Sequence, residues 1–178
     1  MRVIAGEFRS RRLKTIPGLA TRPTPDRLRE TLFDILGSQI AGAIFLDAYA
    51  GTGAVGIEAL SRGARQVIFI ERSKNAVQVI RENLATLGIE DRARLVTTSV
   101  ASSLARHKAD IAFLDPPYEC EGEYASAFEA LRENPPALII VQHSVRFALP
   151  DSFASFQRTR TLKQGDNVLS FYGPMQES

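Results

Sequence analysis

The chain has 178 residues, of which 44% are hydrophobic and 24% are charged. These values are typical of a folded globular protein and exclude an intrinsically disordered chain. No apolar run approaches the ~20 residues that a membrane-spanning helix needs, and the N-terminus lacks the apolar segment of a secretion signal. The single cysteine excludes an intrachain disulfide and a cysteine-rich metal site. We therefore expect a cytoplasmic protein with no membrane partner and no metal.

Basic side chains are concentrated near the N-terminus. The net charge is +2 overall, but residues 1–30 carry eight basic and three acidic side chains, so that segment is +5 and the remainder is −3. This asymmetry indicates a surface that meets a polyanion, although a solvated hairpin beside an unrelated core gives the same pattern.

The N-terminal part of the chain predicts a hairpin followed by a helix. Residues 2–16 alternate apolar and basic side chains, which predicts an extended hairpin or arm. Two prolines make 21–25 a predicted loop, because proline fits neither a helix interior nor a central strand. Thr24 is then placed to cap a helix that begins at Pro25 and ends at Gly37.

From residue 43 onward, apolar runs alternate with helical segments. Strands are predicted at 44–47, 66–71, 94–97, 109–114 and 137–141. One predicted helix ends at 60, and the others span 74–87 and 124–131. This alternation implies crossover connections and a parallel sheet covered on both faces. The last predicted strands, 153–161 and 167–172, flank Gly165-Asp166 and favour a closing antiparallel hairpin.

Together these elements predict an α/β fold with a doubly wound, mostly parallel, seven-stranded sheet of the Rossmann-like type. A C-terminal antiparallel hairpin closes the sheet, and a basic N-terminal β arm precedes it. We interpret residues 1–178 as a single domain, in which 1–24 form the basic arm and 25–178 form the core.

A glycine-rich turn follows the first predicted strand. In the run DAYAGTGAVG at 47–56, Gly51, Gly53 and Gly56 match the spacing of a dinucleotide-binding loop. The glycines allow a tight turn and let a cofactor lie against the backbone at a helix N-terminus. Glu71, at the end of the second strand, is placed to hydrogen-bond ribose hydroxyls. The motif alone does not distinguish a site for NAD from one for S-adenosylmethionine. A glycine-rich turn that serves packing only is the alternative.

Asp47 favours the methyl donor over NAD. Its carboxylate stands at the end of the first strand, four positions before the first glycine. A negative charge there suits a ligand that carries an ammonium and a sulfonium, and it opposes a pyrophosphate. The alternative is that Asp47 caps a backbone group.

The fourth predicted strand runs directly into Asp115, Pro116, Pro117 and Tyr118. Ligands of open α/β sheets bind beyond the carboxyl ends of the strands, where strand order reverses, so we expect this tetrapeptide to face the glycine-rich turn. The two prolines fix the backbone and remove two amide donors, which leaves carbonyl acceptors. A rigid turn that ends a strand is the alternative interpretation.

Such acceptors match what an aromatic amine needs, because its lone pair is delocalised into the ring. If the Asp115 carboxylate and the Pro116 carbonyl each accept one N–H, the nitrogen lone pair can point at a sulfonium methyl. Tyr118 offers a flat face for the base, a stacking contact worth roughly 1–3 kcal/mol. Transfer then depends on positioning and electrostatics and requires no metal. We predict four catalytic residues: Asp115, Pro116, Pro117 and Tyr118.

With these motifs the chain resembles the RsmD-type family of bacterial 16S ribosomal RNA guanine-N2 methyltransferases along nearly its whole length. The resemblance includes RVIAG at 2–6, TRPTPDRLRETLF at 21–33, AGTGAVGIEALSRGA at 50–64 and DPPY at 115–118. The glycine loop and DPPY are shared with many amino-methylating enzymes, whereas TRPTP and EALSRGA are more particular. Members of this family have a class I methyltransferase fold.

The resemblance implies methylation of the N2 amine of a guanine in 16S rRNA by a monomer that uses S-adenosylmethionine and acts on an assembled 30S particle. Asp47, Gly51 and Gly53 would line the methionine side of the donor, Glu71 the ribose, and Asp115 with Tyr118 the guanine. The predicted donor-binding residues are Asp47, Ala50, Gly51, Thr52, Gly53, Glu71, Arg72, Ser99, Val100 and Asp115. The residues predicted to bind RNA phosphates are Arg2, Arg9, Arg11, Arg12, Lys14 and Arg22.

Two positions depart from the family pattern. Relatives often carry Asp after the third strand, where it binds the adenine amine. Val100 stands there in this chain, which leaves adenine recognition to backbone groups or to Ser99. The fifth strand ends in Gln142-His143 where relatives commonly carry Glu, and we interpret His143 as a surface or RNA-contact residue.

The residues alone leave other activities open. An amino-methyltransferase acting on adenine N6 or cytosine N4, in DNA or RNA, would use the same motifs. A nicotinamide-dependent oxidoreductase would share the glycine-rich turn, but the chain has no evident acid or base for a hydride site. A catalytically inactive RNA-binding module would leave the intact tetrapeptide unexplained.

Overall fold

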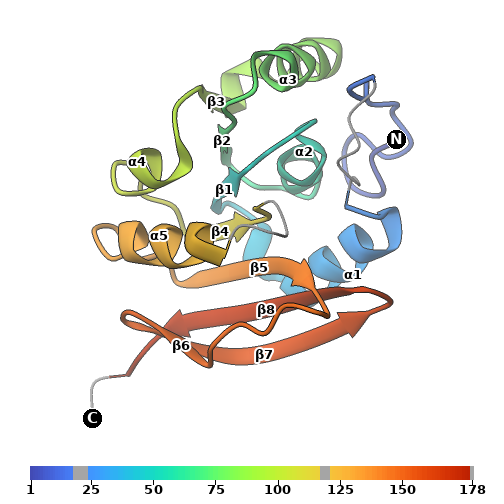
Figure 1. The fold of residues 1–178 in the computed structure, drawn as a ribbon. Coiled ribbons are helices and arrows are strands. Elements are labelled where there is room, and N and C mark those ends of the chain that lie inside the picture. The colour runs from blue at the N-terminus through green and yellow to red at the C-terminus, as the bar shows by residue number, and fades with distance from the viewer. Residues whose placement is uncertain (18–23, 117–120, 177–178) are drawn as a thin grey trace.

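The computed structural model describes residues 1–17, 24–116 and 121–176. Its central feature is an eight-stranded sheet in the order β3-β2-β1-β4-β5-β8-β7-β6 (Figure 1). The strands are β1 (Ile44–Ala48), β2 (Gln66–Ile70), β3 (Ala93–Val96), β4 (Ile111–Leu114), β5 (Leu138–Ser144), β6 (Ser152–Phe153), β7 (Phe156–Gln164) and β8 (Asn167–Pro174). The helices are α1 (Asp26–Leu36), α2 (Ala54–Ser61), α3 (Lys74–Leu87), α4 (Val100–Leu104) and α5 (Glu121–Leu131), with short 3-10 helices η1 (Gly37–Ile40) and η2 (Glu90–Arg92).

Strands β1 to β5 run parallel to one another, and β8 pairs antiparallel with β5. β1 lies between β2 and β4, so the strand order reverses beside β1. In an open α/β sheet this reversal marks the place, beyond the carboxyl ends of the strands, where ligands bind. The topology therefore points to the segments that follow β1, β2 and β4.

The two faces of the sheet are covered by different helices (Figure 1). Phe45 of β1 packs in one cluster with α1, α2 and α3, whereas its neighbour Leu46 packs in a second cluster with α4 and α5. Successive side chains of a strand point to opposite faces, so an inner strand covered on both faces is apolar throughout. This is why the inner strands read as apolar runs in the sequence.

Local signals set several helix boundaries. The Oγ of Ser73 accepts the N–H of Ala76 at the start of α3, and Gly88 ends that helix in a left-handed conformation. α1 ends at Gly37, as predicted. Within the described ranges, no helix has the length and apolar composition to cross a membrane.

Most predicted elements are present with ends shifted by up to three residues. Seven strands correspond to predicted ones, and β6 is an additional strand of two residues. A turn at Ala154, with a φ of 50°, divides the predicted strand 153–161 into β6 and β7. α4 was not predicted, because five residues are too few to show a helical period.

The prediction that Thr24 caps α1 is wrong. Pro25 occupies the N-cap position, and no side chain among the described residues caps the helix. The Thr24 hydroxyl instead donates to Oε1 of Gln142, at the end of β5, over 3.1 Å. The two residues are 118 positions apart, so local sequence carries no sign of this bond.

The N-terminal segment, residues 1–17, is a basic hairpin that packs into the fold. Arg2 and Arg12 form an antiparallel bridge, in place of the longer strands that a β arm would have. Val3, Phe8 and Leu13 are buried in the cluster that contains α1, α2 and α3. The basic hairpin is therefore seated on the helical layer and continues the core.

Glu58 anchors the basic hairpin from the buried helix α2. Its carboxylate accepts the backbone N–H groups of Ile4 and Ala5, at 2.9 and 3.0 Å, and the Nε–H of Arg62 at 2.9 Å. The fully buried guanidinium of Arg29 lies 3.7 Å from the same carboxylate. Burial lowers the pKa of Arg29, an effect that the neighbouring carboxylates oppose. The hairpin, α1 and α2 thus share one buried charged cluster.

We expect Glu58→Ala to lower the free energy of unfolding by about 3–5 kcal/mol, because the buried Arg29 would lose one of its two carboxylate partners and the backbone N–H groups of Ile4 and Ala5 would lose their acceptor. Urea denaturation followed by circular dichroism measures the change. Glu129→Ala on α5, which removes an exposed ion pair with Arg132 just after that helix, serves as the control and should cost less than about 1 kcal/mol. Equal losses in the two variants would contradict the anchoring role of Glu58.

Candidate active site

The carboxyl ends of β1, β2 and β4 bring together three acidic residues that are distant in the sequence. Asp47 lies in β1, Glu71 directly follows β2, and Asp115 directly follows β4. Because β1 lies between β2 and β4, the three segments are neighbours at one edge of the sheet. The structure therefore groups the acidic residues that the sequence analysis singled out.

The glycine loop, residues 49–53, follows β1 and is held by Glu71. Gly51 and Gly53 have φ values of 58° and 79°, which residues with a side chain rarely adopt. The Glu71 carboxylate accepts the N–H of Gly51 and the N–H of Ser73, both at 2.8 Å. Each of its oxygens keeps a second lone pair that can accept from a ribose hydroxyl. The sequence did not reveal that Glu71 also holds the backbone of the glycine loop.

The glycines of this region serve two purposes. A Cβ at Gly56 would lie 2.4 Å from the ring of Phe69, so close packing of α2 on the sheet excludes any side chain there. A Cβ at Gly51 would meet no described atom within 4 Å. Gly51 therefore exposes bare backbone at the edge of the sheet, as a cofactor loop requires.

Asp47 is a buried carboxylate with a solvent exposure of 2%. Its Oδ2 accepts the N–H of Gly56, in the first turn of α2, at 2.9 Å. Burial raises the pKa of Asp47 well above its ordinary value, and repulsion from the Asp115 and Glu71 carboxylates adds to the effect. Asp47 therefore does cap a backbone group, as the alternative interpretation had it. Its carboxylate is also close enough to those of Asp115 and Glu71 to interact with them electrostatically.

Asp115 and Pro116 are the members of the predicted catalytic tetrapeptide that the structure describes. Burial raises the pKa of the Asp115 carboxyl to about 7. Pro116 is buried at the start of the connection from β4 to α5. Pro117 and Tyr118 lie outside the described residues.

The chemistry of this donor set favours a cation. The raised pKa of Asp47 comes first from burial, and repulsion from the Asp115 and Glu71 carboxylates adds to it. A positively charged ligand beside them would relieve that repulsion, whereas a pyrophosphate would increase it. A ligand with an ammonium and a sulfonium therefore suits this edge better than a pyrophosphate does.

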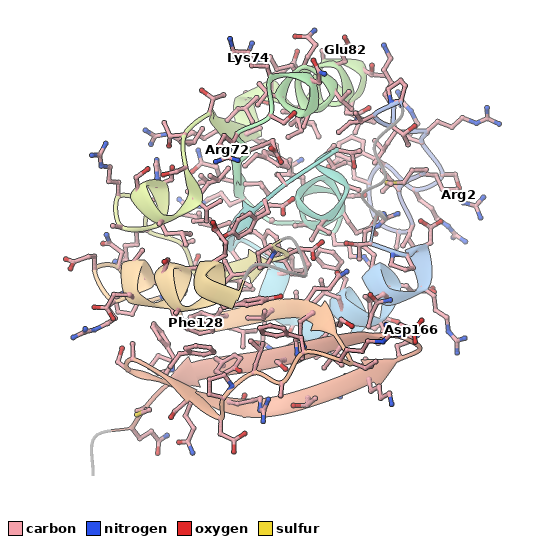
Figure 2. The ribbon with its side chains drawn as sticks, in the orientation of Figure 1. Arg2, Arg72, Lys74, Glu82, Phe128 and Asp166 are labelled. Atoms are coloured by element: carbon pink, nitrogen blue, oxygen red, sulfur yellow. The ribbon has the colours of Figure 1, made fainter. Side chains whose placement is uncertain are left out.

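The other predicted donor-binding residues border the same edge. Ala50 and Thr52 belong to the glycine loop, and Arg72 is exposed just after the end of β2 (Figure 2). Ser99 is exposed immediately before α4. Val100 begins α4 and is buried in the apolar cluster of that face. Val100 therefore contributes an apolar side chain, and no carboxylate, at the start of α4.

Tyr49 is a residue of the glycine loop that the sequence analysis missed. Its φ of 61° is unusual for a residue with a side chain, and such a conformation costs about 1–3 kcal/mol. Its hydroxyl donates to Oε2 of Glu123 on α5 over 2.8 Å. Tyr49 thus ties the glycine loop to the helix that follows the tetrapeptide. An aromatic residue beside glycines was visible in the sequence, but its partner was not.

The interpretation of His143 as a surface residue is wrong. Its side chain is 4% exposed, and its Nε2 lies 2.8 Å from the Oγ of Ser170 in β8. Its Nδ1 lies 3.0 Å from the carbonyl oxygen of Phe147. Burial lowers the pKa of His143, which favours the neutral imidazole. His143 therefore joins β5 to β8, the strand of the C-terminal antiparallel hairpin that pairs with β5.

The predicted RNA-binding residues of the basic hairpin lie on its surface. The exposed members are Arg2, Arg9, Arg11, Arg12 and Lys14. Arg2 points outward from the hairpin (Figure 2). Arg11 donates to a backbone carbonyl of α3, and Lys14 pairs with Glu82 of α3 at 2.7 Å. Arg22 lies outside the described residues.

Comparison with known proteins places the chain in a family. The family model described as Conserved hypothetical protein 95 matches residues 1–173. The chain is 36% identical over 178 residues to Ribosomal RNA small subunit methyltransferase D of Escherichia coli (strain K12), a match that covers 97% of this chain and 89% of that protein. The chain belongs to the RsmD-type methyltransferase family.

Other relatives agree in sequence and in fold. YlbH of Bacillus subtilis (strain 168) is 34% identical over 182 residues, covering 97% of this RsmD-type chain and 98% of YlbH. The solved structure of Escherichia coli yhhF matches with a TM-score of 0.85 and 34% identity over 99% of both chains. The Thermus thermophilus protein TTHA0928 matches with a TM-score of 0.79 and 31% identity, over 96% of this chain and 98% of that one. The matches include the basic hairpin, which is therefore part of the RsmD-type fold.

We expect Asp47→Asn to stabilise this RsmD-type protein by on the order of 1 kcal/mol, because it removes a buried charge and keeps an acceptor for the Gly56 N–H. The folded-state pKa of Asp47 is raised, so the ionised carboxylate destabilises the folded protein. This destabilisation is absent below the unfolded-state pKa, and it is complete once the pH has risen through the folded-state pKa. The gain in Tm should therefore be larger at pH 8 than at pH 4.

Thermal unfolding at the two pH values measures this effect. Asp91→Asn, which alters an exposed carboxylate of η2, is the control and should leave Tm nearly unchanged at both. A Tm for Asp47→Asn below that of the wild type at pH 8 would contradict the buried-charge account.

Proposed function

We propose that this protein transfers a methyl group from S-adenosylmethionine to the exocyclic N2 amine of a guanine in 16S rRNA within an assembled 30S particle. The convergence of Asp47, Glu71 and Asp115 at the ends of three neighbouring strands carries the proposal. An acidic edge beside a glycine loop suits a cationic methyl donor. The name of the Escherichia coli relative, Ribosomal RNA small subunit methyltransferase D, supports small-subunit RNA as the acceptor.

The donor would be held along the glycine loop. Asp47, Gly51 and Gly53 would line its methionine part, with the ammonium beside the acidic edge. Glu71 would accept from the ribose hydroxyls. The remaining contacts would come from Ala50, Thr52, Arg72, Ser99 and Val100. S-adenosylmethionine supplies a methyl group that its positively charged sulfur makes electrophilic.

Asp115 would prepare the guanine amine for attack. Its carboxylate accepts one N–H of the amine and the Pro116 carbonyl accepts the other, which directs the nitrogen lone pair toward the methyl group. Pro117 would keep this turn rigid, and Tyr118 would stack on the base. Methyl transfer to the amine would leave a surplus proton on its nitrogen, which would pass to Asp115 or to water.

Residues 1–24 would form a basic arm that binds rRNA phosphates, and residues 25–178 the catalytic core of a monomeric enzyme. Phosphate contacts position a protein on RNA without reading its sequence. Because Val3, Phe8 and Leu13 fix the basic hairpin to the core, its arginines stand at set distances from the acidic edge. The hairpin would therefore locate the target guanine by geometry.

We expect Asp115→Asn to lower kcat/KM by about 10²-fold or more, because an amide replaces the second carboxylate oxygen by a donor. In the wild type, kcat/KM should rise with pH through about 7 and then level off, since the ionised Asp115 is the stronger acceptor for the amine N–H and burial raises its pKa to about 7. The residual activity of the variant should lack this step. Tritiated methyl transfer to small ribosomal subunits from cells that lack the enzyme measures both quantities.

Mass spectrometry of the digested RNA identifies the product. N2-methylguanosine that is absent when Asp115 is replaced would support the proposal. N6-methyladenosine or N4-methylcytidine would overturn the guanine assignment, and a lack of transfer by the wild-type protein would overturn the proposed function. Asp91→Asn should retain full transfer, which controls for loss of a carboxylate elsewhere.

We expect Arg9→Ala combined with Arg12→Ala to weaken binding to small ribosomal subunits and to reduce the slope of log K against log salt concentration by about 2, one for each lost phosphate contact. Filter binding over a salt series measures the slope. Arg106→Ala with Lys108→Ala removes two exposed charges before β4, at the opposite edge of the sheet, and should leave the slope unchanged. Equal effects of the two double variants would count against the basic hairpin as the RNA contact.

A further inference from the structure

Asn83 of α3 is a buried polar residue that lies between the basic hairpin and the glycine loop. Its side chain is 2% exposed, and it stands within the apolar stripe of α3 formed by Ile80, Leu84 and Leu87. A buried amide needs partners for its oxygen and for both N–H groups. The residues that supply these partners belong to two segments far apart in the sequence.

The first partner is the basic hairpin. The backbone N–H of Lys14 donates to Oδ1 of Asn83 over 2.7 Å, and Nδ2 of Asn83 donates to the backbone carbonyl of Lys14 over 3.2 Å. Such an amide-to-peptide pair resembles one rung of a β-ladder, and it fixes the plane of the side chain. The salt bridge between Lys14 and Glu82 reinforces the same contact, and Glu82 lies on α3 (Figure 2).

The second partner is the glycine loop. The Nδ2 of Asn83 also donates to the backbone carbonyl of Thr52 over 3.2 Å. Gly53, the next residue, packs so closely on α3 that a Cβ there would lie 3.2 Å from Ile80. In addition, the Thr52 hydroxyl lies 3.9 Å from the sulfur of Met1, at the start of the basic hairpin. The loop and the hairpin therefore meet on one face of α3.

We propose that Asn83 is a positioning residue that couples the basic hairpin to the glycine loop, so that RNA bound on the hairpin and methyl donor bound on the loop strengthen each other. This inference rests on the proposed function. The two amide donations of Asn83 go to Lys14 and to Thr52, so a shift of the hairpin backbone requires the amide to turn and the Thr52 carbonyl to follow. Because coupling between two binding sites is reciprocal, each ligand changes the affinity of the other by the same factor.

The Asn83 amide supplies both the acceptor and the donations that this connection uses. Aspartate would keep the acceptor for the Lys14 N–H but lose both donations, and alanine would leave three backbone groups without their partner. Ser61 of α2 offers a matched contrast, because its hydroxyl accepts from Phe8 and donates to Ala5 in the basic hairpin, and neither of these two bonds involves α3 or the glycine loop. Ser61 therefore seats the hairpin but does not link it to the donor.

The test measures the Kd of tritiated S-adenosylhomocysteine by equilibrium dialysis, with and without saturating small ribosomal subunits from cells that lack the enzyme. In the wild type, the subunits should lower this Kd by about 5-fold or more. In Asn83→Asp and Asn83→Ala the ratio should fall to near 1. Ser61→Ala should keep the wild-type ratio even where it weakens subunit binding. A merely structural role of Asn83 would change each affinity but leave the ratio intact.

The outcomes separate this inference from the proposed function. Failure of the wild-type protein to bind subunits or to transfer methyl groups would overturn the proposed function. Binding and transfer with a ratio near 1 in the wild type would overturn the coupling alone. The coupling would also be overturned if both Asn83 variants kept the ratio, or if Ser61→Ala abolished it as they do. Asn83→Asp preserves side-chain volume, and its Tm shows whether it is folded should Asn83→Ala prove unstable.

Discussion

Three carboxylates at the ends of neighbouring strands, with Asp47 buried among them, govern the structure of the site. An ionised carboxylate is costly to bury, and here Asp47 receives one backbone N–H while it faces Asp115 and Glu71. The fold tolerates this repulsion because the surrounding strands and α2 are well packed. The same carboxylates that lower the stability of the fold would be stabilised by a bound cation. Their cost in stability and their capacity to bind a cation therefore have one origin.

The neighbouring segments are placed by polar residues, of which Glu58 and Thr24 are buried. Glu58 seats the basic hairpin on α2, and Glu71 holds the backbone of Gly51. Tyr49 ties the glycine loop to α5, and Thr24 bonds to Gln142 at the end of β5. In each case the partner is a backbone group or a side chain from a distant segment. Such bonds give the irregular segments around the site defined positions, because a buried polar group left without its partner is costly.

The pattern-based predictions succeeded where a local rule decides the outcome. The helix over residues 74–87 begins after Ser73 and ends at Gly88, since capping hydroxyls and left-handed glycines act within one turn. The strand-end positions of Asp47, Glu71 and Asp115 followed from apolar runs and from the topology of open α/β sheets. Thr24 and His143 were misread, because each bonds to a partner far along the chain that no local rule identifies.

The sequence by itself determined the order of strands and helices, the glycine loop, the acidic residues at the strand ends and the family. These features depend on periodicity, turn chemistry and short motifs, all of which lie within a few residues of one another. Only the tertiary structure decided that the basic hairpin belongs to the core, that Asp47 is buried against Gly56, and that Asn83 contacts both the hairpin and the glycine loop. A buried polar side chain bonds to whichever group the fold brings beside it, and that choice is made by packing in three dimensions.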